Sequence, residues 1–545
     1  MNIFSSNYDY DIIIIGGGIS GLYCAYKLSK TQLKILVLEK NDRLGGRINT
    51  ESRSNLAFDS GARRFHKKHS KFTSLINELG LKDKIIELPD NVDYILRGKK
   101  SNYNYNTTEK LDTEELLQNA IKNKGKLRKG KLMNITFYQY LMMLYDSECV
   151  QFIKDTFGYD SEIMELSAYS AINMYKGDLF GENKYYTLNG GLSQIIDRLE
   201  EELKLMENVV LKKGIDISEL HEKYIITGDK DKFNYKHVIL TIPANKLKHL
   251  SYFNDKLSFD SVKPVKLLRI YIQYPTTNLW FRNIKTTITD NYIRNIIPID
   301  YDKGLIMISY TDGIYSRMLE SYNQISKSLL VKILHKEIYH LFGIEPPKPR
   351  MISTHFWENG IHLWKPGYDM DDEYNKMIKP NKSEEIYLCG ESFSKKQGWI
   401  EGALETCFDV IQSLPLGDFK VQVKKETIKD IHTEGVEEDG EDSDNEDVED
   451  KYYSIEEVLL QKKWIILDHD GKKGIYDLKN WVKIHPGGSI ISKGIDSNGY
   501  YDPELRKTYF KSPYDVWKTF HTEDILNKYI IQKNEYISKI GYLKE

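Results

Sequence analysis

The 545-residue sequence predicts an α/β fold with a parallel sheet at its N-terminus. The first observation is an apolar run, Ile12 to Ile15, which is too short to cross a membrane and is typical of a buried parallel strand. The second is a glycine-rich turn directly after it. The third is a second segment typical of a buried strand, Lys34 to Leu38, which ends at an acidic residue, Glu39. Together they predict a strand, a turn, a helix and a second strand.

The glycine-rich turn has the GxGxxG pattern of a Rossmann-type dinucleotide site. Gly16 permits a tight turn, Gly18 leaves the backbone open to a pyrophosphate, and Gly21 lets the helix pack closely on the strand. We expect the helix to run to about Lys30, with its N-terminal amides facing the phosphates. Glu39, 18 residues after Gly21, is expected to accept hydrogen bonds from the ribose hydroxyls. An acid there disfavours a 2′-phosphate.

The segment NDRLGGR, which follows the second strand, favours FAD over NAD. Gly45 and Gly46 turn the chain, and Arg47 can bring its guanidinium to the pyrophosphate. At this point the chain resembles the flavin-containing amine oxidases, which include monoamine and polyamine oxidases, L-amino-acid oxidases and histone demethylases. The resemblance implies an α/β Rossmann-type FAD-binding domain with an α+β substrate domain inserted into it, the amine oxidase fold.

The resemblance can be followed to about residue 415. FDSGARRFH resembles the family's segment beside the flavin, which implies that Gly61, Arg63 and Arg64 lie near the cofactor. YTLNGGLSQIIDRLEEEL, residues 185–203, resembles the family's Gly-Gly turn into a helix. HVILTIPANKL, residues 237–247, resembles the strand that leaves the FAD domain.

The last matching segment is YLCGESFSKKQGWIEGALETCFDVI, residues 387–411, which resembles the family's closing flavin motif. The resemblance implies that Glu391 contacts the cofactor, that the backbone of Ile400 meets the isoalloxazine, and that Gly402 opens a helix pointing at it. The cysteine that anchors flavin covalently in monoamine oxidases has no counterpart around residues 355–370, so we expect noncovalent FAD.

These matches imply an amine oxidase region over residues 1–425. Its FAD-binding parts are expected at about 1–65, 186–245 and 385–415. The substrate domain would take a largely helical part, about 66–185, and a part richer in strands, about 246–384. The amino-acid sequence of the segments around residues 267–300 also resembles that of amine oxidase homologues of giant DNA viruses and some protists.

The candidate catalytic residues are Arg269 and Trp399. In most amine oxidases the strand matching LLRIYIQYPTTNLWF carries a lysine that holds water at flavin N5, and this alignment places Arg269 there. A shifted alignment would place Lys266 there, but the alternation of Ile270 and Ile272 fits a strand only in the first register. Arginine keeps a positive charge at the reacting edge but will not lose its proton, so reaction with oxygen need not be fast.

Trp399 occupies a place where several family members have a tyrosine of the aromatic wall at the flavin, so we expect it at the substrate. Trp357 and Trp364 are equally compatible with that wall and with the core.

Beyond this region the chain changes character. Residues 426–450 are expected to form an acidic disordered linker, because Glu434 to Asp450 holds eleven acids and no base. Removing these eleven charges from the formal net charge of −3 leaves the rest of the chain at +8. A basic run, Lys122 to Lys131, lacks interleaved aromatics, so a solvated loop is favoured over a nucleic-acid partner.

Residues 451–545 resemble cytochrome b5 and predict a small α+β haem-binding domain. WIIL and IYDL would be core strands, and HPGG would present His485 as an axial haem ligand. His521, in an aromatic-His-helix context, would be the second ligand, giving a bis-His haem b. The two histidines are 36 positions apart, roughly a dozen more than is usual in that family, so a b5-like fold without haem stays open. The extra residues would form a loop, which costs little free energy.

The predicted function is an FAD-dependent amine oxidase or dehydrogenase that transfers hydride from a carbon bearing an amine, with O2 or the fused haem as electron acceptor. The alternatives are a flavin dehydrogenase or desaturase acting on a nonamine substrate, or a noncatalytic redox or structural flavoprotein. The four cysteines show no zinc-pair spacing, and no leader or apolar run of eighteen residues occurs. These features predict a soluble cytoplasmic protein without a membrane partner, packaged in a virion if it is viral. They leave the oligomeric state open.

Overall fold

The computed structural model describes residues 8–53, 55–100, 111–123, 127–178, 184–254 and 256–415, and four strands between residues 452 and 543. The chain divides into two units, Met1–Thr427 and Ile428–Glu545. Each unit is described by itself. Within the described residues, no helix is both long and apolar enough to cross a membrane.

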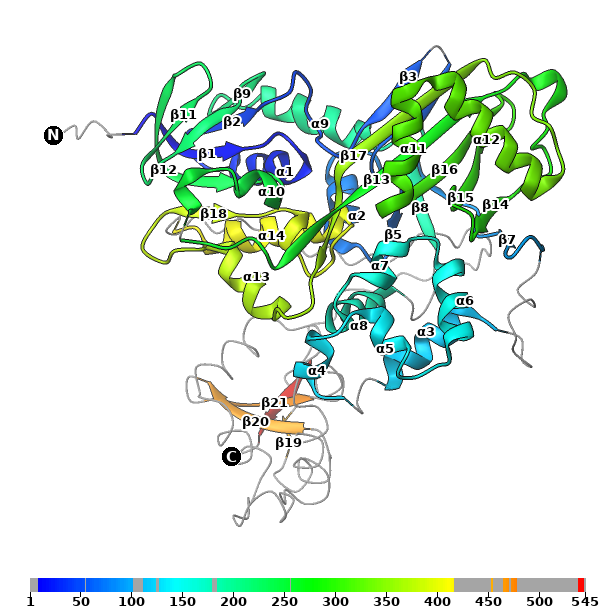
Figure 1. Ribbon diagram of the computed structural model, residues 1–545. Coiled ribbons are helices and arrows are strands. Elements are labelled where there is room, and N and C mark those ends of the chain that lie inside the picture. The colour runs from blue at the N-terminus through cyan, green and yellow to red at the C-terminus, as the bar shows by residue number, and fades with distance from the viewer. Residues whose placement is uncertain are drawn as a thin grey trace, which may run out of the picture. The chain divides into compact units, whose positions relative to one another are not determined.

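The first sheet of the larger unit carries the glycine-rich turn. Its strands run in the order β10-β11-β12-β1-β2-β9, and β18 also pairs with β12 (Figure 1). The neighbours β1, β2 and β9 are parallel, as are β1 with β12 and β12 with β18. The bounds are β1 (Tyr10–Ile15), β2 (Ile35–Glu39), β9 (Val209–Lys213), β10 (Ile217–Leu220), β11 (Tyr224–Thr227), β12 (Lys232–Leu240) and β18 (Ile386–Leu388). The predicted strand-turn-helix-strand order is confirmed.

Three helices pack with this sheet: α1 (Ile19–Leu28), α9 (Ser193–Lys204) and α14 (Ile400–Ser413). The helix α1 contacts both α9 and α14. Their apolar faces share one core with β1 and β2, in which Leu22, Leu199 and Leu404 are fully buried. The closing segment of the chain therefore returns to the helix that follows the glycine turn.

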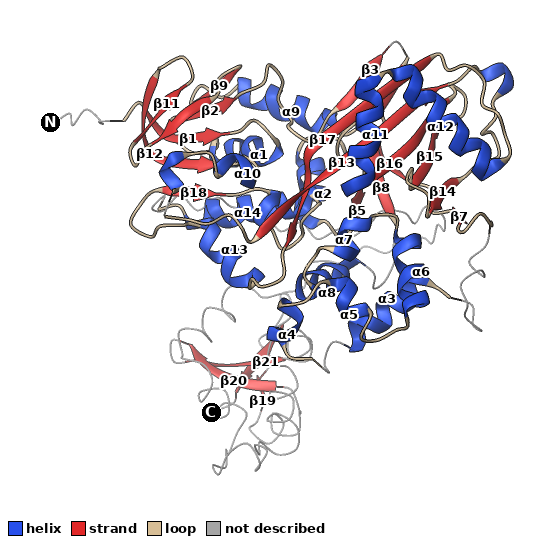
Figure 2. Cartoon of the chain, in the orientation of Figure 1, coloured by secondary structure: helices blue, strands red, loops and turns tan. Residues whose placement is uncertain are grey.

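The second sheet has the order β17-β13-β16-β15-β14-β7 (Figure 2). Leu268, Ile270 and Ile272 of β13 form a core with residues of two covering helices. The bounds are β7 (Val92–Ile95), β13 (Val262–Gln273), β14 (Thr286–Thr289), β15 (Asn295–Asp300), β16 (Leu305–Asp312), β17 (Met351–Trp364), α11 (Gly313–Ile325) and α12 (Lys327–Phe342). All of these elements except β7 fall within residues 246–384, where a part richer in strands was expected, whereas β7 falls in the range expected to be largely helical.

A group of helices lies between residues 113 and 178, within the range expected to be largely helical. They are α3 (Thr113–Lys122), α4 (Lys129–Met133), α5 (Phe137–Leu141), α6 (Ser147–Phe157), α7 (Asp160–Met164) and α8 (Ala168–Asp178). Buried Arg294 joins this group to the second sheet, because its guanidinium lies 3.1 Å from Asp160 and donates to the Lys154 carbonyl.

Short elements connect these layers. The hairpin of β3 (Thr50–Arg53) and β4 (Leu56–Asp59) follows the loop after β2. The strands β5 (Phe65–His66), β8 (Tyr185–Leu188) and β6 (Ile85–Glu87) form a small antiparallel sheet. The remaining helices are α2 (Ser70–Glu78), α10 (Ala244–Leu247) and α13 (Met370–Ile378).

The described part of the second unit is a sheet of the order β19-β22-β21-β20. Its strands are β19 (Tyr452–Tyr453), β20 (Trp464–His469), β21 (Lys472–Asp477) and β22 (Ser538–Leu543). The expected strands WIIL and IYDL fall within or overlap β20 and β21, which pair antiparallel. The expected acidic linker, residues 426–450, and the two expected haem ligands, His485 and His521, lie outside the described residues.

Candidate active site

Among the four glycines of the glycine-rich turn, only Gly18 has room for a side chain. Gly16 has a φ of +109°, and its N–H donates to the Leu38 carbonyl at 2.8 Å. A Cβ on Gly21 would lie 1.9 Å from the Gly16 oxygen, so only glycine fits there. A Cβ on Gly18, by contrast, would have its nearest neighbour 3.9 Å away. The backbone of the turn is therefore open at Gly18, where a pyrophosphate would meet it.

Glu39 lies at the end of β2 beside this turn. Its Oε2 accepts the Gly17 N–H at 2.7 Å, and its Oε1 accepts the backbone N–H and side-chain amide of Asn41 at 2.9 and 2.6 Å. A carboxylate has about four lone-pair sites, so these three contacts fix its orientation and leave capacity for a ribose hydroxyl.

Arg47 and Glu391 meet in the structure. Arg47 Nη1 lies 2.6 Å from Glu391 Oε2 and 3.2 Å from the Gly360 carbonyl oxygen. The buried Glu391 carboxylate also accepts the backbone N–H groups of His362 and Gly398, at 2.8 and 2.9 Å. Burial alone would raise the pKa of Glu391, but Arg47 and His362 outweigh it and hold the pKa well below its usual value.

Gly61 packs directly against the Arg47 backbone. A Cβ on Gly61 would lie 2.0 Å from the Arg47 carbonyl oxygen, which instead accepts the Ala62 N–H at 2.9 Å. On the other side, Trp357 Nε1 donates to the Ser60 carbonyl at 2.8 Å. The segment expected beside the flavin is thus held between the Arg47 loop and β17.

Arg63, Arg64 and Arg269 form a group of positive charges, which we call the arginine group. Arg269 is buried, and its Nη1 donates to the Asp59 carbonyl at 3.0 Å. Its guanidinium lies 4.2 Å from the Tyr310 ring centroid. Burial lowers the pKa of Arg63, and the charges of Arg269 and Arg64 act in the same direction. Asp59 lies beside this group and burial raises its pKa, and the charge of a second acid, Glu162, acts on Arg64.

Lys266 lies outside the arginine group. Its ammonium pairs with Glu358 at 2.8 Å, and both side chains are more than a third exposed. The β13 register, with Ile270 and Ile272 in the core and Tyr271 facing the Phe58 side, is the one that the alternation predicted. The structure therefore brings Arg269, and not Lys266, to the segment beside the expected flavin.

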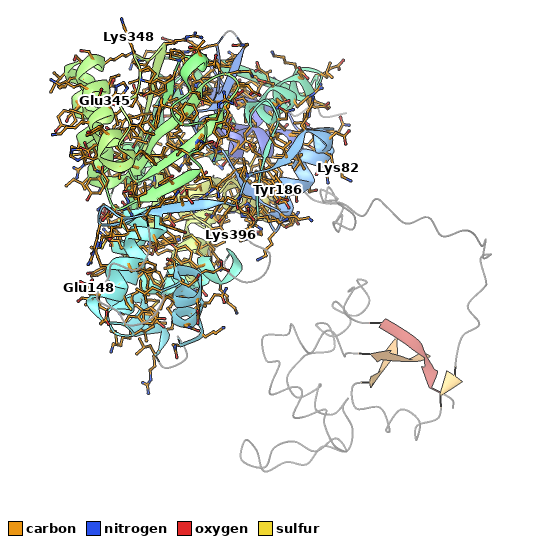
Figure 3. The ribbon with its side chains drawn as sticks, turned by 90° about the vertical axis from the view of Figure 1, so that its right-hand side faces the viewer. Lys82, Glu148, Tyr186, Glu345, Lys348 and Lys396 are labelled. Carbon is orange, nitrogen blue, oxygen red and sulfur yellow. The ribbon has the colours of Figure 1, made fainter. Side chains whose placement is uncertain are left out.

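Trp399 directly precedes α14 and belongs to a group of aromatic side chains. Its ring lies parallel to that of Tyr185, with centroids 6.0 Å apart and an interplanar angle of 9°. The Arg64 guanidinium lies 4.3 Å from the Tyr185 centroid and 5.9 Å from that of Trp399, and the His69 ring meets Trp399 edge-on at 4.9 Å. Tyr186, beside Tyr185, and Lys396, three residues before Trp399, are labelled in Figure 3.

Tyr185, His69 and His362 were missed by the sequence reasoning. Tyr185 begins the Gly-Gly segment, so its position was visible but its role was not. The other two tryptophans have different surroundings. Trp364 is buried in the core and donates to the Ser394 carbonyl, whereas the Trp357 indole N–H donates to the Ser60 carbonyl, next to Gly61.

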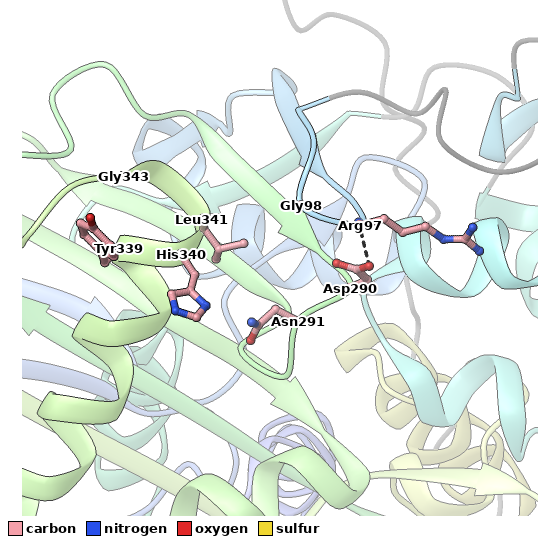
Figure 4. Close-up of a pocket in the computed structure, with 8 residues that line it drawn as sticks. All are labelled: Arg97, Gly98, Asp290, Asn291, Tyr339, His340, Leu341 and Gly343. Carbon is pink, nitrogen blue, oxygen red and sulfur yellow. Dashed lines mark hydrogen bonds between the residues drawn. The ribbon is translucent and has the colours of Figure 1, made fainter.

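A separate shallow pocket of about 690 Å³ lies in the substrate domain. It is lined by residues that include Arg97, Asp290, Asn291 and His340, and the Arg97 backbone N–H donates to Asp290 at 2.9 Å (Figure 4). None of the site residues named above lines it, so we assign it no part in the site.

The residues present fit FAD. The open backbone at Gly18, the acid Glu39 at the end of β2 and the Gly61 segment beside Arg269 are the features a dinucleotide with a reactive flavin requires. The fold and this site together define an FAD-dependent oxidoreductase.

Comparison with known proteins also identifies a flavin-dependent oxidoreductase. Residues 19–408 match the family model described as flavin containing amine oxidoreductase. The chain belongs to this family. It is 24% identical to an uncharacterized protein of Acanthamoeba polyphaga mimivirus, with 75% of this chain and 94% of that one covered. The expected likeness to a giant-virus homologue is confirmed.

Two further likenesses bear on fold and chemistry. The chain is 22% identical to the flavin-dependent L-tryptophan oxidase RebO of Lentzea aerocolonigenes, over 75% of this chain and 98% of that one. A solved structure of a redesigned putrescine oxidase superposes with a TM-score of 0.60 at 17% identity, covering 74% of this chain and 99% of the other. The second likeness confirms the amine oxidase fold.

Proposed function

We propose that the enzyme oxidises the Cα–N bond of an α-amino acid, with O2 as the electron acceptor. The observation that carries the substrate class is the position of Arg64 beside two aromatic rings and away from any described carboxylate partner. Its guanidinium lies against Tyr185 and near Trp399, and no described carboxylate lies within ion-pair distance of it. A planar guanidinium with free donors is suited to bind a carboxylate through two parallel hydrogen bonds.

The charge of the arginine group supports an amino acid over a diamine. Arg63, Arg64 and Arg269 lie close together, with Asp59 and Glu162 as the acids whose charges act on them, so the positive charges outnumber the negative ones. A second ammonium group on the substrate would be repelled here, whereas a carboxylate would be attracted. The likeness to an L-tryptophan oxidase points in the same direction. The likeness to putrescine oxidase is one of fold.

The residues of the chain would divide the work as follows. Arg64 would hold the substrate carboxylate, and the parallel rings of Tyr185 and Trp399 would border the substrate beside it. FAD, when bound, supplies the hydride acceptor and the route of two electrons to O2. Arg269, held by the Asp59 carbonyl and Tyr310, would keep a fixed positive charge where negative charge develops.

The test compares L-tryptophan with tryptamine, which lacks the carboxylate. We expect L-tryptophan to bleach the flavin under anaerobic conditions, with a kcat/KM at least about tenfold above that of tryptamine, because charge-assisted hydrogen bonds contribute about 1.5–3 kcal/mol. Arg64→Gln should remove this preference. Arg198→Gln is the matched control, because Arg198 pairs with Glu201 on the exposed face of α9. Equal preference in wild type and Arg64→Gln would contradict the proposal.

We also propose that the C-terminal unit binds haem and can take electrons from the flavin. This second proposal is supported by the antiparallel pairing of β20 with β21, the two strands that the resemblance to cytochrome b5 predicted. Purified protein should show a Soret band that His485→Ala abolishes. Absence of the band after haem supplementation would reject haem binding. If the haem of the wild-type protein is not reduced when L-tryptophan reduces the flavin without oxygen, electron transfer to the haem is rejected.

A further inference from the structure

Three cysteine side chains meet behind the glycine-rich turn. Cys24 lies on α1, Cys389 directly follows β18, and Cys407 lies on α14. Cys24 and Cys407 are fully buried, and Cys389 is 8% exposed. The Sγ atoms of Cys24 and Cys389 are 3.8 Å apart, those of Cys389 and Cys407 are 3.5 Å apart, and all three lie within 4.8 Å of one another.

The cluster could not be recognised from the spacing of the cysteines in the sequence. The whole chain has four cysteines, and the only one outside the cluster is Cys149, on α6. Cys24 and Cys389 are 365 positions apart, so the fold alone brings them together. All four cysteines lie in described parts of the chain, and none of them forms a disulfide.

The spacing of the sulfurs suits an ion bound by all three. Thiolates prefer soft ions, and bonds of about 2.3 Å to a common centre hold three sulfurs about 3.8–4.0 Å apart. Two of the observed distances, 3.5 and 3.8 Å, need to grow by at most a few tenths of an ångström, and the third pair, Cys24 and Cys407, lies within 4.8 Å. Among the described residues the cluster contains no fourth His, Cys, Asp or Glu ligand, which disfavours zinc with its four-coordinate preference.

We propose that Cys24, Cys389 and Cys407 form a binding site for a soft ion that takes three sulfur ligands, of the class of Cu(I) and trivalent arsenic. The binding step needs no oxidant. Arsenous acid and three thiols give a neutral tris-thiolate and three waters, and Cu(I) displaces thiol protons to solvent.

The position of the site links it to the cofactor cradle. The Cys407 thiol donates to the carbonyl of Ser20, which lies in the first turn of α1, between Gly18 and Gly21 of the glycine pattern. Cys389 precedes Gly390, whose N–H donates to Thr406 on α14 at 2.8 Å. A bound ion would therefore join α1, the segment after β18 and α14 at one point. It should stabilise the folded protein by an amount that rises with the logarithm of the ratio of free ion concentration to dissociation constant.

The experiment uses the full-length flavoprotein carrying Cys149→Ser, so that the cluster supplies every remaining thiol. The protein is titrated anaerobically with Cu(I) against a chromogenic chelator, with arsenite, and with Zn(II), and bound ions are counted by mass spectrometry. We expect one Cu(I) or one arsenic per chain, a higher unfolding temperature, and weaker zinc binding. Cu(I) alone or arsenite alone would each support the site and identify its ion. Binding of neither would overturn it.

Variants locate the ion. Cys24→Ser and Cys407→Ser should each weaken binding at least about tenfold, since each removes one of three ligands. Cys24→Ala serves as a second variant if the serine disturbs the core, and unchanged flavin content shows that the fold is kept. Binding that survives in both Cys24→Ala and Cys407→Ser would place the ion elsewhere and contradict the proposal.

Discussion

Arg47 and Glu391, 344 positions apart, form an ion pair of 2.6 Å between the loop after β2 and the segment before α14. His362 donates a backbone N–H to the same carboxylate, so β17 joins the contact. Both residues were expected at the cofactor on separate grounds. Their pairing shows that the two ends of the FAD-binding domain are fixed to each other at that point, and that the cofactor would bind against an already paired charge.

The first prediction concerns this ion pair. Glu391→Gln leaves the Arg47 charge without its partner, and we expect the free energy of unfolding to fall by about 2–3 kcal/mol, near the lower end for broken buried pairs because Arg47 is partly exposed. Flavin content should fall with it. Glu405→Gln is the control, since Glu405 pairs with Lys396 near the surface, where such pairs contribute less than about 1 kcal/mol. Urea unfolding followed by tryptophan fluorescence measures the free energy of unfolding of both variants. Equal losses of stability in Glu391→Gln and Glu405→Gln would contradict the prediction.

The same carboxylate predicts a dependence on acid. The pKa of Glu391 in the folded protein lies below its unfolded value, which is about 4.3. The ionised form is therefore favoured by folding, and its contribution to stability is present above about pH 4.3 and lost as the pH falls towards the folded pKa. The difference in unfolding free energy between wild type and Glu391→Gln should stay constant from about pH 5 to 8 and shrink below about pH 4. A difference that grows on acidification would refute this assignment.

Arg269 should govern the reaction with oxygen. Arg269→Met removes a fixed positive charge, and we expect reoxidation of the reduced flavin to slow by at least about tenfold. The change should be tolerated structurally, because Tyr271 still donates to the Asp59 carbonyl at 2.6 Å. Arg269→Lys should recover part of the rate. Lys266→Met is the control, because Lys266 pairs with Glu358 at the surface. Stopped-flow mixing of reduced enzyme with oxygen compares all three, and a slow Lys266→Met enzyme would favour the other alignment.

Gly61 should tolerate no side chain. A Cβ there would lie 2.0 Å from the Arg47 carbonyl oxygen, so Gly61→Ala must displace the backbone that carries Arg63 and Arg64. We expect a loss of stability of more than about 2 kcal/mol and a reduced ratio of flavin to protein. Gly130→Ala is the matched control, since a Cβ on Gly130 has no neighbour within 4 Å. The absorbance ratio of the purified proteins decides between the two outcomes, and full flavin content in Gly61→Ala would show that the contact is not limiting.

The nucleotide half of the site could be predicted because its signals are local. The turn from Gly16 to Gly21 and the acid Glu39 follow one another within a single strand-helix-strand unit, so their spacing carries the geometry. The β13 register was also predictable, because alternation decides which side chains face the core.

The contacts between distant segments could not be predicted in this way. The parallel rings of Tyr185 and Trp399 depend on how β8 meets the start of α14, and periodicity contains no information on that approach. The three clustered thiols are a second case. The linear spacing of the cysteines showed no metal pattern, because their ligand atoms are brought together by three different elements.

The paired rings give the last prediction. If Tyr185 and Trp399 border the substrate, Trp399→Ala should raise KM for L-tryptophan more than for L-alanine, because only the larger side chain loses an aromatic contact, which is worth about 0.5–1.5 kcal/mol or a two- to tenfold effect. Trp399→Phe should keep most of the affinity. Trp364→Phe is the control, since Trp364 lies in the core and should change stability without changing the ratio of the two KM values. Steady-state peroxide release with both amino acids measures that ratio, and an equal rise for both substrates in Trp399→Ala would place this residue in the scaffold rather than at the substrate.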